Sequence, residues 1–210
     1  SRNYKGLAQN IIDALESGES IANQPELQAN LDDINAVCAQ MKDELRQRVL
    51  YWSKQGKKVA LLGGDHSTPL GYYEALAEMH NDFGILHLDA HMDLRIAYEG
   101  FTYSHASIMY NTLQLPQVSK LVQVGIRDFC QQEVEVAQSQ ENRVVVYTDM
   151  DMKAETFSGI TWQQQCDAII AHLPQKVVVS FDIDGLYPWY CPNTGTPVPG
   201  GFSFEQAAYL

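Results

Sequence analysis

The sequence predicts an α/β protein built as a three-layer, doubly wound, mostly parallel sheet with helices on both faces. Short apolar runs of strand length recur along the chain, and they alternate with longer segments in which apolar residues recur every three or four positions. Strands that alternate with helices in this way are typical of such sheets. No internal repeat or low-complexity tract interrupts the pattern, so we expect the 210 residues to form one domain.

The helical segments are identified by their spacing and by their end signals. In the first segment Leu7, Ile11 and Leu15 fall on one face, and Gly18 is placed to end the helix. A later segment begins at Pro69, and proline is favoured in the first turn of a helix. The predicted helices are 4–17, 27–55, 69–80, 129–140 and 161–172.

Five apolar runs have the length of buried strands. The central run, which begins at Phe83, follows the turn-forming pair Asn81-Asp82 and is followed by Asp89. Such short runs are expected to be strands that are covered on both faces. The predicted strands are 59–62, 83–89, 121–126, 144–147 and 177–181.

Three of these strands are followed by carboxylates and imidazoles. Because successive side chains of an extended chain point to opposite faces, residues at alternate positions such as Asp89, His91 and Asp93 can converge on one side. In an open parallel sheet, ligands bind at the carboxyl ends of the strands, so the three strand ends describe one site. The candidate metal ligands are His66, Asp89, His91, Asp93, Asp182 and Asp184.

This set of side chains favours two manganese ions. Six ligands exceed the three that a catalytic zinc usually takes, and they suit two ions that share a bridging carboxylate. An oxygen-rich set with two imidazoles favours manganese. The carboxylates nearly offset the charge of two divalent ions, so the site could accept a cationic substrate. The alternative interpretation is a set of caps, turns and buried hydrogen-bonding groups.

Two neighbours of the candidate ligands have structural interpretations. Asp65 is expected to orient its loop or a ligand rather than to bind a metal itself. His87 faces the same side as Asp89 by alternation, and we expect it to be a hydrogen-bonded core histidine rather than a ligand.

The composition argues against several classes of protein. A net charge of −12 argues against nucleic acid and anionic membranes as partners, because both select lysine and arginine. No apolar run approaches the ~18–20 residues that span a bilayer, and the first residues lack the apolar core of a signal peptide. The four cysteines are scattered without a Cys-x-x-Cys pair, so we expect reduced thiols and a cytoplasmic protein.

Several motifs resemble those of a known family. Gly-Gly-Asp-His-Ser at 63–67, Asp-Ala-His-Met-Asp at 89–93 and Ser-Phe-Asp-Ile-Asp-Gly-Leu at 180–186 are similar to the signature motifs of the ureohydrolases, which include arginase, agmatinase and formimidoylglutamase. The run at 194–201 resembles the Gly-Thr-Pro-x-x-Gly-Gly loop of that family. The resemblance extends over residues 57–210 and includes all of these motifs in the family order.

The resemblance implies an activity and the residues that carry it. It implies two Mn²⁺ per chain and hydrolysis of a guanidino or amidino C–N bond, with Asp184 helping to hold the tetrahedral intermediate. His105 lies where ureohydrolases carry a histidine that moves protons; the alternative is a histidine that ties down its own loop. Family members commonly form trimers or hexamers, so a homo-oligomer is expected.

The resemblance favours agmatine as substrate. The chain lacks the Asn and Ser-Gly-Asn stretch with which arginases grip an amino acid, whereas Tyr-Ser-His-Ala-Ser at 103–107 resembles agmatinases. We therefore expect conversion of agmatine to putrescine and urea. Arginase, formimidoylglutamase and a metal-binding but inactive relative are the alternatives, and a single-zinc deacetylase of the related fold is a further one.

The chain also departs from the family pattern. Tyr187 replaces the second acid of the usual Asp-Gly-Leu-Asp-Pro, a change expected to reshape the substrate loop or to lower activity. The usual amino-terminal strand and Gly-rich loop, and a later strand with a glutamate, find no counterpart in the 210 residues. We therefore expect the chain to lack N- and C-terminal parts of the family fold.

Overall fold

The structure is a computed structural model that describes residues 3–210 and divides into two compact units. The first, the helical unit, consists of Ser1–Leu76 and Arg95–Asn111. The second, the sheet unit, consists of Ala77–Leu94 and Thr112–Leu210. A single domain can contain two compact units, so this division leaves the predicted one-domain organisation a prediction.

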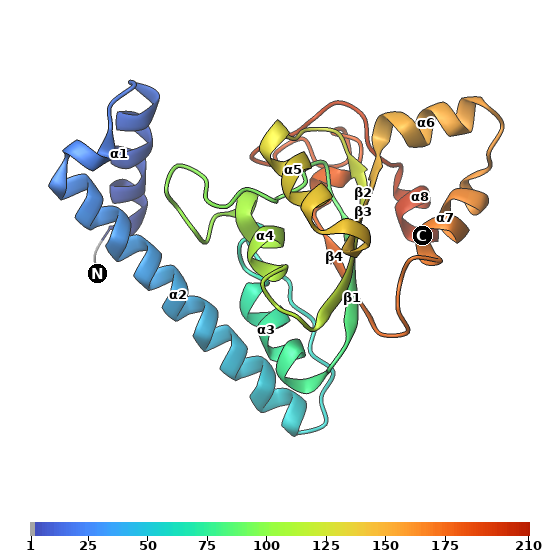
Figure 1. The fold of residues 1–210 in the computed structure, drawn as a ribbon, viewed down its shortest axis with the longest axis horizontal. Helices are drawn as coiled ribbons and strands as arrows, with labels where there is room; N and C mark the ends of the chain where they lie inside the picture. The colour runs from blue at the N-terminus through green and yellow to red at the C-terminus, as the bar shows by residue number, and fades with distance from the viewer. Residues whose placement is uncertain (1–2) are drawn as a thin grey trace. The chain divides into compact units, whose positions relative to one another are not determined.

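The helical unit is built around α1 (Tyr4–Glu16) and α2 (Pro25–Lys54), which lie side by side at the amino-terminal end of α2 (Figure 1). Their apolar faces share a small core, whose buried members are Ile11, Ile21, Leu31 and Ile34. The helix α3 (Leu70–Met79) begins in this unit. The predictions of helices at 4–17, 27–55 and 69–80 are therefore confirmed, with ends shifted by one to two residues.

The predicted strand at 59–62 is wrong. The segment between α2 and α3 is irregular, and Leu62 is fully exposed. A strand is stable only when a neighbour satisfies its backbone groups, and within residues 3–210 none pairs with this segment. One backbone carbonyl, that of Val59, instead accepts a hydrogen bond from the Tyr72 hydroxyl at 3.0 Å.

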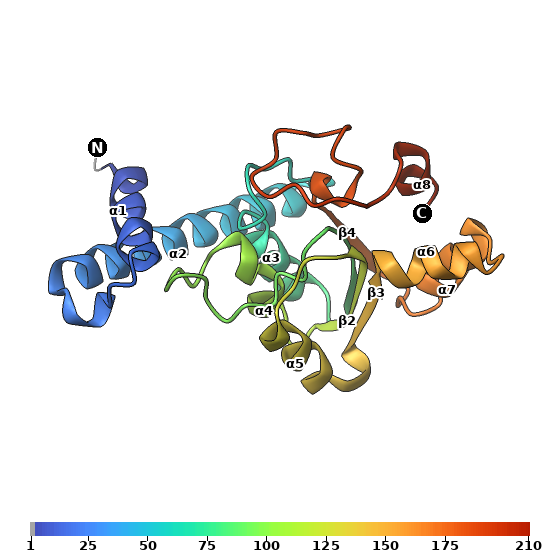
Figure 2. The ribbon, with the colours of Figure 1, turned by 90° about the horizontal axis from the view of Figure 1, so that it is seen from above.

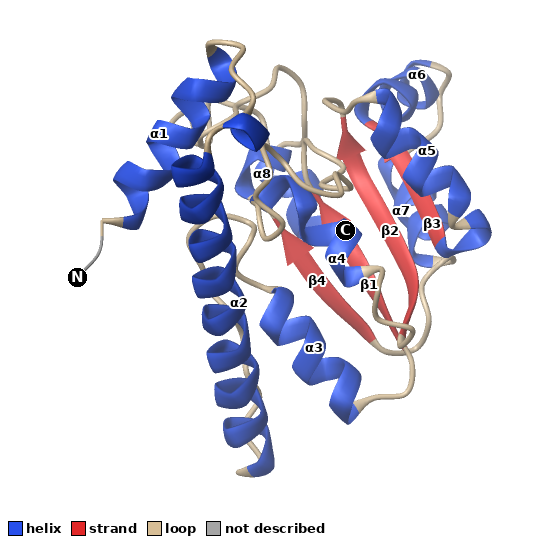
Figure 3. Ribbon diagram, turned by 60° about the vertical axis from the view of Figure 1, so that its left-hand side comes forward, coloured by secondary structure: helices blue, strands red, loops and turns tan. Residues whose placement is uncertain are grey.

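The sheet unit contains four parallel strands in the order β3-β2-β1-β4 (Figure 3). Their bounds are β1 Phe83–Leu88, β2 Val118–Ile126, β3 Val144–Thr148 and β4 Val177–Phe181. Every residue of β1 is buried, as the run of apolar residues predicts for a central strand. The remaining four predicted strands are thus confirmed. The expectation that they are covered on both faces is wrong for β4, where Val179 is 61% exposed.

Helices cover both faces of the sheet. Figure 2 shows α6 (Asp149–Phe157) and α7 (Trp162–Ile170) on one side of it and α5 (Gln131–Ser139) on the other. On the first side a core forms between strand residues such as Leu86 and Val122 and helix residues such as Met152 and Ile169. The sequence predicts α5 and α7 but not α6, nor the short helices α4 (Ile108–Thr112) and α8 (Phe204–Tyr209).

The strand order reverses beside β1. From β1 the chain proceeds outward through β2 to β3, and it then returns to add β4 on the opposite side of β1. The strand order therefore reverses between β1 and β4, and ligands of open α/β sheets bind at the carboxyl ends of the strands at such a point. Asp89 and Asp182 directly follow these two strand ends. Among residues 3–210, no helix combines the length and apolar character needed to cross a bilayer.

Candidate metal centre

Asp89 occupies the end of β1 and is almost fully buried, at 1% exposure. Its Oδ1 atom accepts a hydrogen bond from the His91 backbone N–H at 2.6 Å, and its Oδ2 atom lies 2.8 Å from Nε2 of His87. The chain reaches this position because β1 pairs with strands on both sides, β2 and β4. Contacts at both oxygens fix the orientation of this carboxylate.

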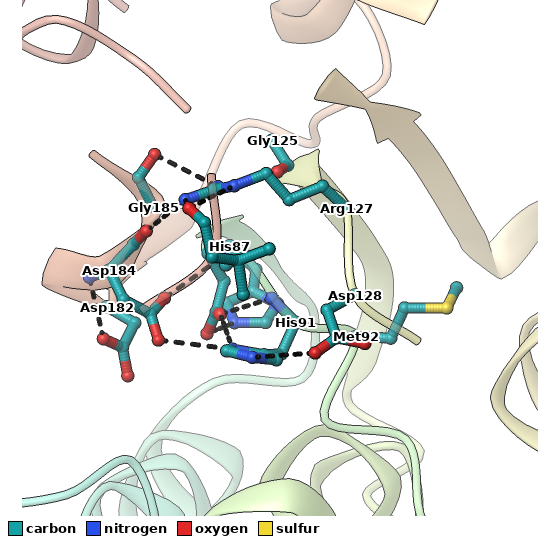
Figure 4. A network of polar contacts seen from close by, with 12 residues as sticks. His87, His91, Met92, Gly125, Arg127, Asp128, Asp182, Asp184 and Gly185 are labelled. Carbon is teal, nitrogen blue, oxygen red and sulfur yellow. Dashed lines mark hydrogen bonds and ion pairs between the residues drawn. The ribbon is translucent and has the colours of Figure 1, made fainter. Parts of the chain in front are cut away.

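Asp89, His91 and Asp184 form a first cluster, whose ligand atoms lie within 4.8 Å of one another. The His91 Nδ1 atom lies 3.3 Å from Asp89 Oδ1. It also lies 3.2 Å from Asp184 Oδ2 (Figure 4). Asp184 is held in place by its Oδ1 atom, which accepts a hydrogen bond from the Ala90 backbone N–H at 3.2 Å. The segment after β4 is thereby hydrogen-bonded to the segment after β1, at the point where the strand order reverses.

The first cluster attracts positive charge. Burial alone would lower the pKa of His91, but hydrogen bonds and charges from Asp184 and Asp89 outweigh it and raise the pKa from 6.5 to about 10. The two carboxylates thus hold a proton on the imidazole at neutral pH. Two oxygen ligands and one nitrogen ligand that already stabilise a cation fit a divalent metal, which would replace that proton.

Asp93 belongs to a second cluster, with His87 and Asp89, whose ligand atoms also lie within 4.8 Å of one another. The backbone of Asp93 is left-handed, with φ of 55°, so the chain does not stay extended to this residue. Aspartate tolerates that conformation better than most residues. His91 and Asp93 lie in two clusters that share Asp89, so the three side chains do approach one another. Their predicted role as a common set of ligands stays a prediction.

Asp182 stands outside both clusters. Residues Ile183–Gly185 form a 3₁₀ turn, and Asp182 caps this turn by accepting a hydrogen bond from the Asp184 backbone N–H at 3.1 Å. The turn replaces the extended chain from which we predict that Asp182 and Asp184 face the same way, so that statement stays a prediction. A ligand role for Asp182 stays a prediction.

Arg127 holds the loop that carries Asp184. Its half-buried guanidinium donates to the backbone carbonyl of Asp184 at 2.6 Å (Figure 4). It donates to that of Val198 at 3.1 Å. It also donates to the carbonyl groups of Gly125, Gly185 and Leu186. Burial lowers the pKa of Arg127, and the charges of nearby aspartates oppose that effect. One side chain thereby ties the end of β2 to both ends of the loop after β4.

Glu133 performs a similar task for the chain after Asp93. It is 3% exposed, and its Oε1 atom accepts from the Leu94 backbone N–H at 3.1 Å while its Oε2 atom accepts from that of Cys130. Sequence reasoning does not identify Arg127 or Glu133, because their partners are backbone groups that lie near only after folding. The only local signal was the position of Glu133 at the start of a predicted helix.

The remaining predicted residues lie in the helical unit. Asp65 accepts hydrogen bonds from the backbone N–H and the hydroxyl of Ser67, so its predicted role in orienting the loop is confirmed. His66 is half-buried in the turn before α3. His105 is exposed at the start of a 3₁₀ turn, with its ring 6.3 Å from that of Tyr98. The ligand role of His66 and the proton-transfer role of His105 stay predictions.

Tyr187, where the resemblance leads one to expect an acid, takes part in an exposed aromatic group. Its ring stacks on that of Trp189, with centroids 4.2 Å apart, and the Lys153 ammonium lies 5.3 Å from its centre. Its backbone N–H donates to the carbonyl of Phe202 at 2.9 Å. The substitution is therefore accommodated within an ordered loop.

Known proteins resemble this chain in both sequence and fold. The chain is 36% identical over 166 residues to the N(1)-aminopropylagmatine ureohydrolase of Thermus thermophilus, which covers 79% of this chain and 53% of that protein. It is 31% identical over 192 residues to the mitochondrial agmatinase of Gallus gallus, which covers 89% of this chain and 53% of that protein. The chain thus spans about half the length of these curated relatives.

A solved structure confirms the predicted fold class. The agmatine ureohydrolase of Thermoplasma volcanium matches with a TM-score of 0.69 at 26% identity, covering 82% of this chain and 55% of that chain. The model of one family, described as the Arginase family, matches residues 9–210. Together with the motifs at the ends of β1 and β4, this match shows that the chain belongs to the arginase family.

Proposed function

We propose that the protein is a binuclear manganese hydrolase that cleaves a guanidino C–N bond, with agmatine converted to putrescine and urea. The observation that carries this proposal is the position of Asp89, which contributes to two adjacent clusters of potential metal ligands. A carboxylate shared by two ions is what a two-metal site needs. Names of relatives, agmatinase and N(1)-aminopropylagmatine ureohydrolase, support the same chemistry.

The residues of the sheet unit have defined tasks in this proposal. Asp89, His91 and Asp184 would hold one ion, and Asp89 with Asp93 would contribute to the other. Held by these residues, manganese would supply a water molecule of lowered pKa as the nucleophile. Asp184, which is 7% exposed and fixed by the Ala90 N–H, places negative charge where a guanidinium carbon would react. His66 and Asp182 are the remaining proposed ligands.

His105 is the proposed group for proton transfer to the leaving amine. Its imidazole is exposed, and an imidazole is the side chain best suited to accept and donate protons at physiological pH. The Ser104 hydroxyl caps the turn on which His105 lies by accepting from the Ala106 N–H at 3.2 Å, which fixes the backbone of that residue. The replacement His105→Asn would lower the rate and spare Mn²⁺ binding.

A decarboxylated amine suits this chain better than an amino acid. Agmatine carries two positive charges and no carboxylate, and the protein has a net charge of −12. The aminopropyl derivative named in the Thermus relative has the same character. Both substrates are therefore compatible with the proposed centre, and agmatine is the simpler of them.

A substrate panel tests the proposal. The purified protein, supplied with Mn²⁺, is incubated with agmatine, N(1)-aminopropylagmatine, arginine, guanidinobutyrate and formiminoglutamate, and urea and formamide are measured. Urea from agmatine, with little from arginine, is the expected result. Release of formamide from formiminoglutamate would overturn the proposal. Manganese binding without any turnover would instead identify a metal-binding, inactive member of the family.

A further inference from the structure

His87 and Gln123 form a buried polar pair directly behind the candidate metal centre. Both side chains are 0% exposed, on the neighbouring strands β1 and β2. The Gln123 Nε2 atom lies 2.9 Å from His87 Nδ1, and His87 Nε2 lies 2.8 Å from Asp89 Oδ2. Burying polar groups costs free energy that only their mutual hydrogen bonds offset, and such a network holds its members rigidly in place.

The backbone carbonyl of Met92 fixes the orientation of the Gln123 amide. The Nε2 atom of Gln123 donates to this carbonyl at 2.6 Å. The opposite orientation of the amide would place Oε1 against the carbonyl oxygen, which brings two acceptors together. With Nε2 in this position, the Oε1 atom is buried and has no hydrogen-bond partner among residues 3–210. Gln123 thus presents N–H groups on the side that faces His87.

The orientation of Gln123 determines which nitrogen of His87 carries the proton. An amide N–H that points at Nδ1 requires Nδ1 to accept, so Nδ1 carries no proton. The proton of the neutral ring is then on Nε2, from which it is donated to Asp89 Oδ2. A nitrogen that donates in this way is not available as a metal ligand.

We infer that Gln123 and His87 are positioning residues for Asp89: the amide holds the imidazole as its Nε2–H tautomer, and the imidazole fixes the carboxylate that both ion sites share. This inference rests on the proposed manganese centre. The partner behind a ligating group fixes its orientation, and losing such a partner typically weakens metal affinity about 10–100-fold. The carboxylate keeps further lone pairs on both oxygens for metal ions.

Two substitutions of His87 distinguish a role as hydrogen-bond donor to Asp89 from a role as metal ligand. Glutamine can place an amide N–H near the position of Nε2, whereas methionine has a similar volume and no donor. We expect His87→Met to weaken Mn²⁺ binding about 10–100-fold and His87→Gln to bind with close to wild-type affinity. Mn²⁺ dissociation constants are measured by calorimetry and by the paramagnetic resonance of free Mn²⁺, on protein stripped with a chelator.

Gln165 provides a matched control for Gln123. It is 2% exposed, and its Nε2 donates to the Met152 carbonyl and to the Thr156 hydroxyl at 2.9 and 3.0 Å. Its Oε1 atom also lacks a partner within the described chain. Gln123→Met and Gln165→Met therefore remove the same chemistry, but only Gln123→Met is expected to weaken Mn²⁺ binding, by about tenfold.

Nitrogen-15 NMR of the metal-free wild type tests the tautomer of His87 directly, so this measurement does not depend on the stability of a variant. Comparison with His87→Gln assigns the ring signals, and we expect a protonated Nε2 and an unprotonated Nδ1. A proton on Nδ1, tight Mn²⁺ binding by His87→Met, or equal loss from both glutamine variants would each overturn the inference. Wild-type protein that binds no Mn²⁺ would overturn the proposed function and this inference together, whereas the other outcomes leave the proposed function standing.

Discussion

At the scale of single residues, the centre depends on how buried charges are compensated. Asp89 and Asp184 are 1% and 7% exposed, and their negative charges converge on the imidazole of His91. Without a metal, a proton on that imidazole supplies the positive charge, as the raised pKa of His91 indicates. The exposed carboxylate of Asp128 lies 3.8 Å from His91 Nε2.

The raised pKa predicts how the stability of the metal-free protein changes with pH. The pKa of His91 is about 10 in the fold and near its ordinary 6.5 in the unfolded chain. The folded state therefore holds more protons between these values, and the free energy of unfolding falls as pH rises from 6.5 to about 10. The stabilisation is fully present below pH 6.5. Urea denaturation with a chelator at several pH values measures it.

The variant His91→Asn serves as the control for this prediction. It removes the titrating ring, so its stability should fall less over the same pH range. A metal-free wild type whose stability stays constant or rises from pH 6.5 to 10 would contradict the assignment of a protonated His91 between Asp89 and Asp184.

At the scale of elements, the loop after β4 is fixed by one arginine. Arg127 extends from the end of β2, and its five carbonyl partners lie at Gly125 and in the loop. Asp149 also anchors the loop, since its Oδ1 accepts from the Gly201 backbone N–H at 3.2 Å. The position of Asp184 therefore depends on hydrogen bonds to its backbone and to its loop, not only on contacts of its side chain.

Removing the Arg127 guanidinium should affect both the fold and the metal. We expect Arg127→Met to destabilise the protein by about 2 kcal/mol or more, because several carbonyls lose a charged donor. The same variant should bind Mn²⁺ more weakly, because the backbone of Asp184 is released. Chemical denaturation and metal titration measure the two effects separately.

Arg143 is the matched control for Arg127. It too is half-buried and donates to backbone carbonyls, those of Val118, Leu113 and Leu115, at the start of β2 rather than at its end. Arg143→Met should destabilise the fold comparably and leave Mn²⁺ affinity unchanged. Equal effects of the two variants on affinity would contradict a specific role for Arg127 at the metal centre.

The elements that the sequence predicts are those whose signal is local. Each of β1, β4, α1 and α2 can be predicted from the apolar pattern of its own segment alone. The run at 59–62 has the same composition as a strand, but strand formation depends on a neighbour that no local pattern reveals. The helix α6 was missed because it follows β3 without a loop and its segment is largely polar.

The sequence predicts which residue types form the candidate metal centre better than it predicts their backbone conformations. The residue types after β1 and β4 indicate metal chemistry, and Asp89, His91, Asp93 and Asp184 do gather in two clusters. The backbone differs from the extended chain that the alternation argument assumes, because Asp93 is left-handed and Asp184 lies in a 3₁₀ turn.

The supporting residues could not be predicted from the sequence alone. Gln123, Arg127 and Glu133 contact residues at least 31 positions away along the chain, or join segments that meet only through the sheet.

At the scale of the whole molecule, metal binding and stability are linked. The chain carries a net charge of −12, and the sheet unit gathers several of its carboxylates at the ends of β1 and β4. Divalent cations relieve that repulsion in the folded state and find no preformed cluster in the unfolded chain. Ions that bind only the folded state stabilise it.

Mn²⁺ should therefore raise the melting temperature. At a concentration of 100 times its dissociation constant, one ion adds about 2.7 kcal/mol, which corresponds to a shift of about 5–10 °C for a protein of this size. Thermal denaturation with and without Mn²⁺ measures the shift, and excess chelator should reverse it. Mg²⁺ at the same concentration serves as the comparison ion, with a smaller expected effect. An unchanged melting temperature under saturating Mn²⁺ would argue against metal binding by the fold.

The number of manganese ions that each chain binds tests the central claim most directly. Elemental analysis after equilibrium dialysis should give two Mn²⁺ per wild-type chain, one for Asp184→Asn, and none held tightly by Asp89→Asn, because only Asp89 belongs to both clusters. Wild-type stoichiometry in Asp89→Asn, or a wild type that retains no manganese, would contradict a two-ion centre built on this carboxylate.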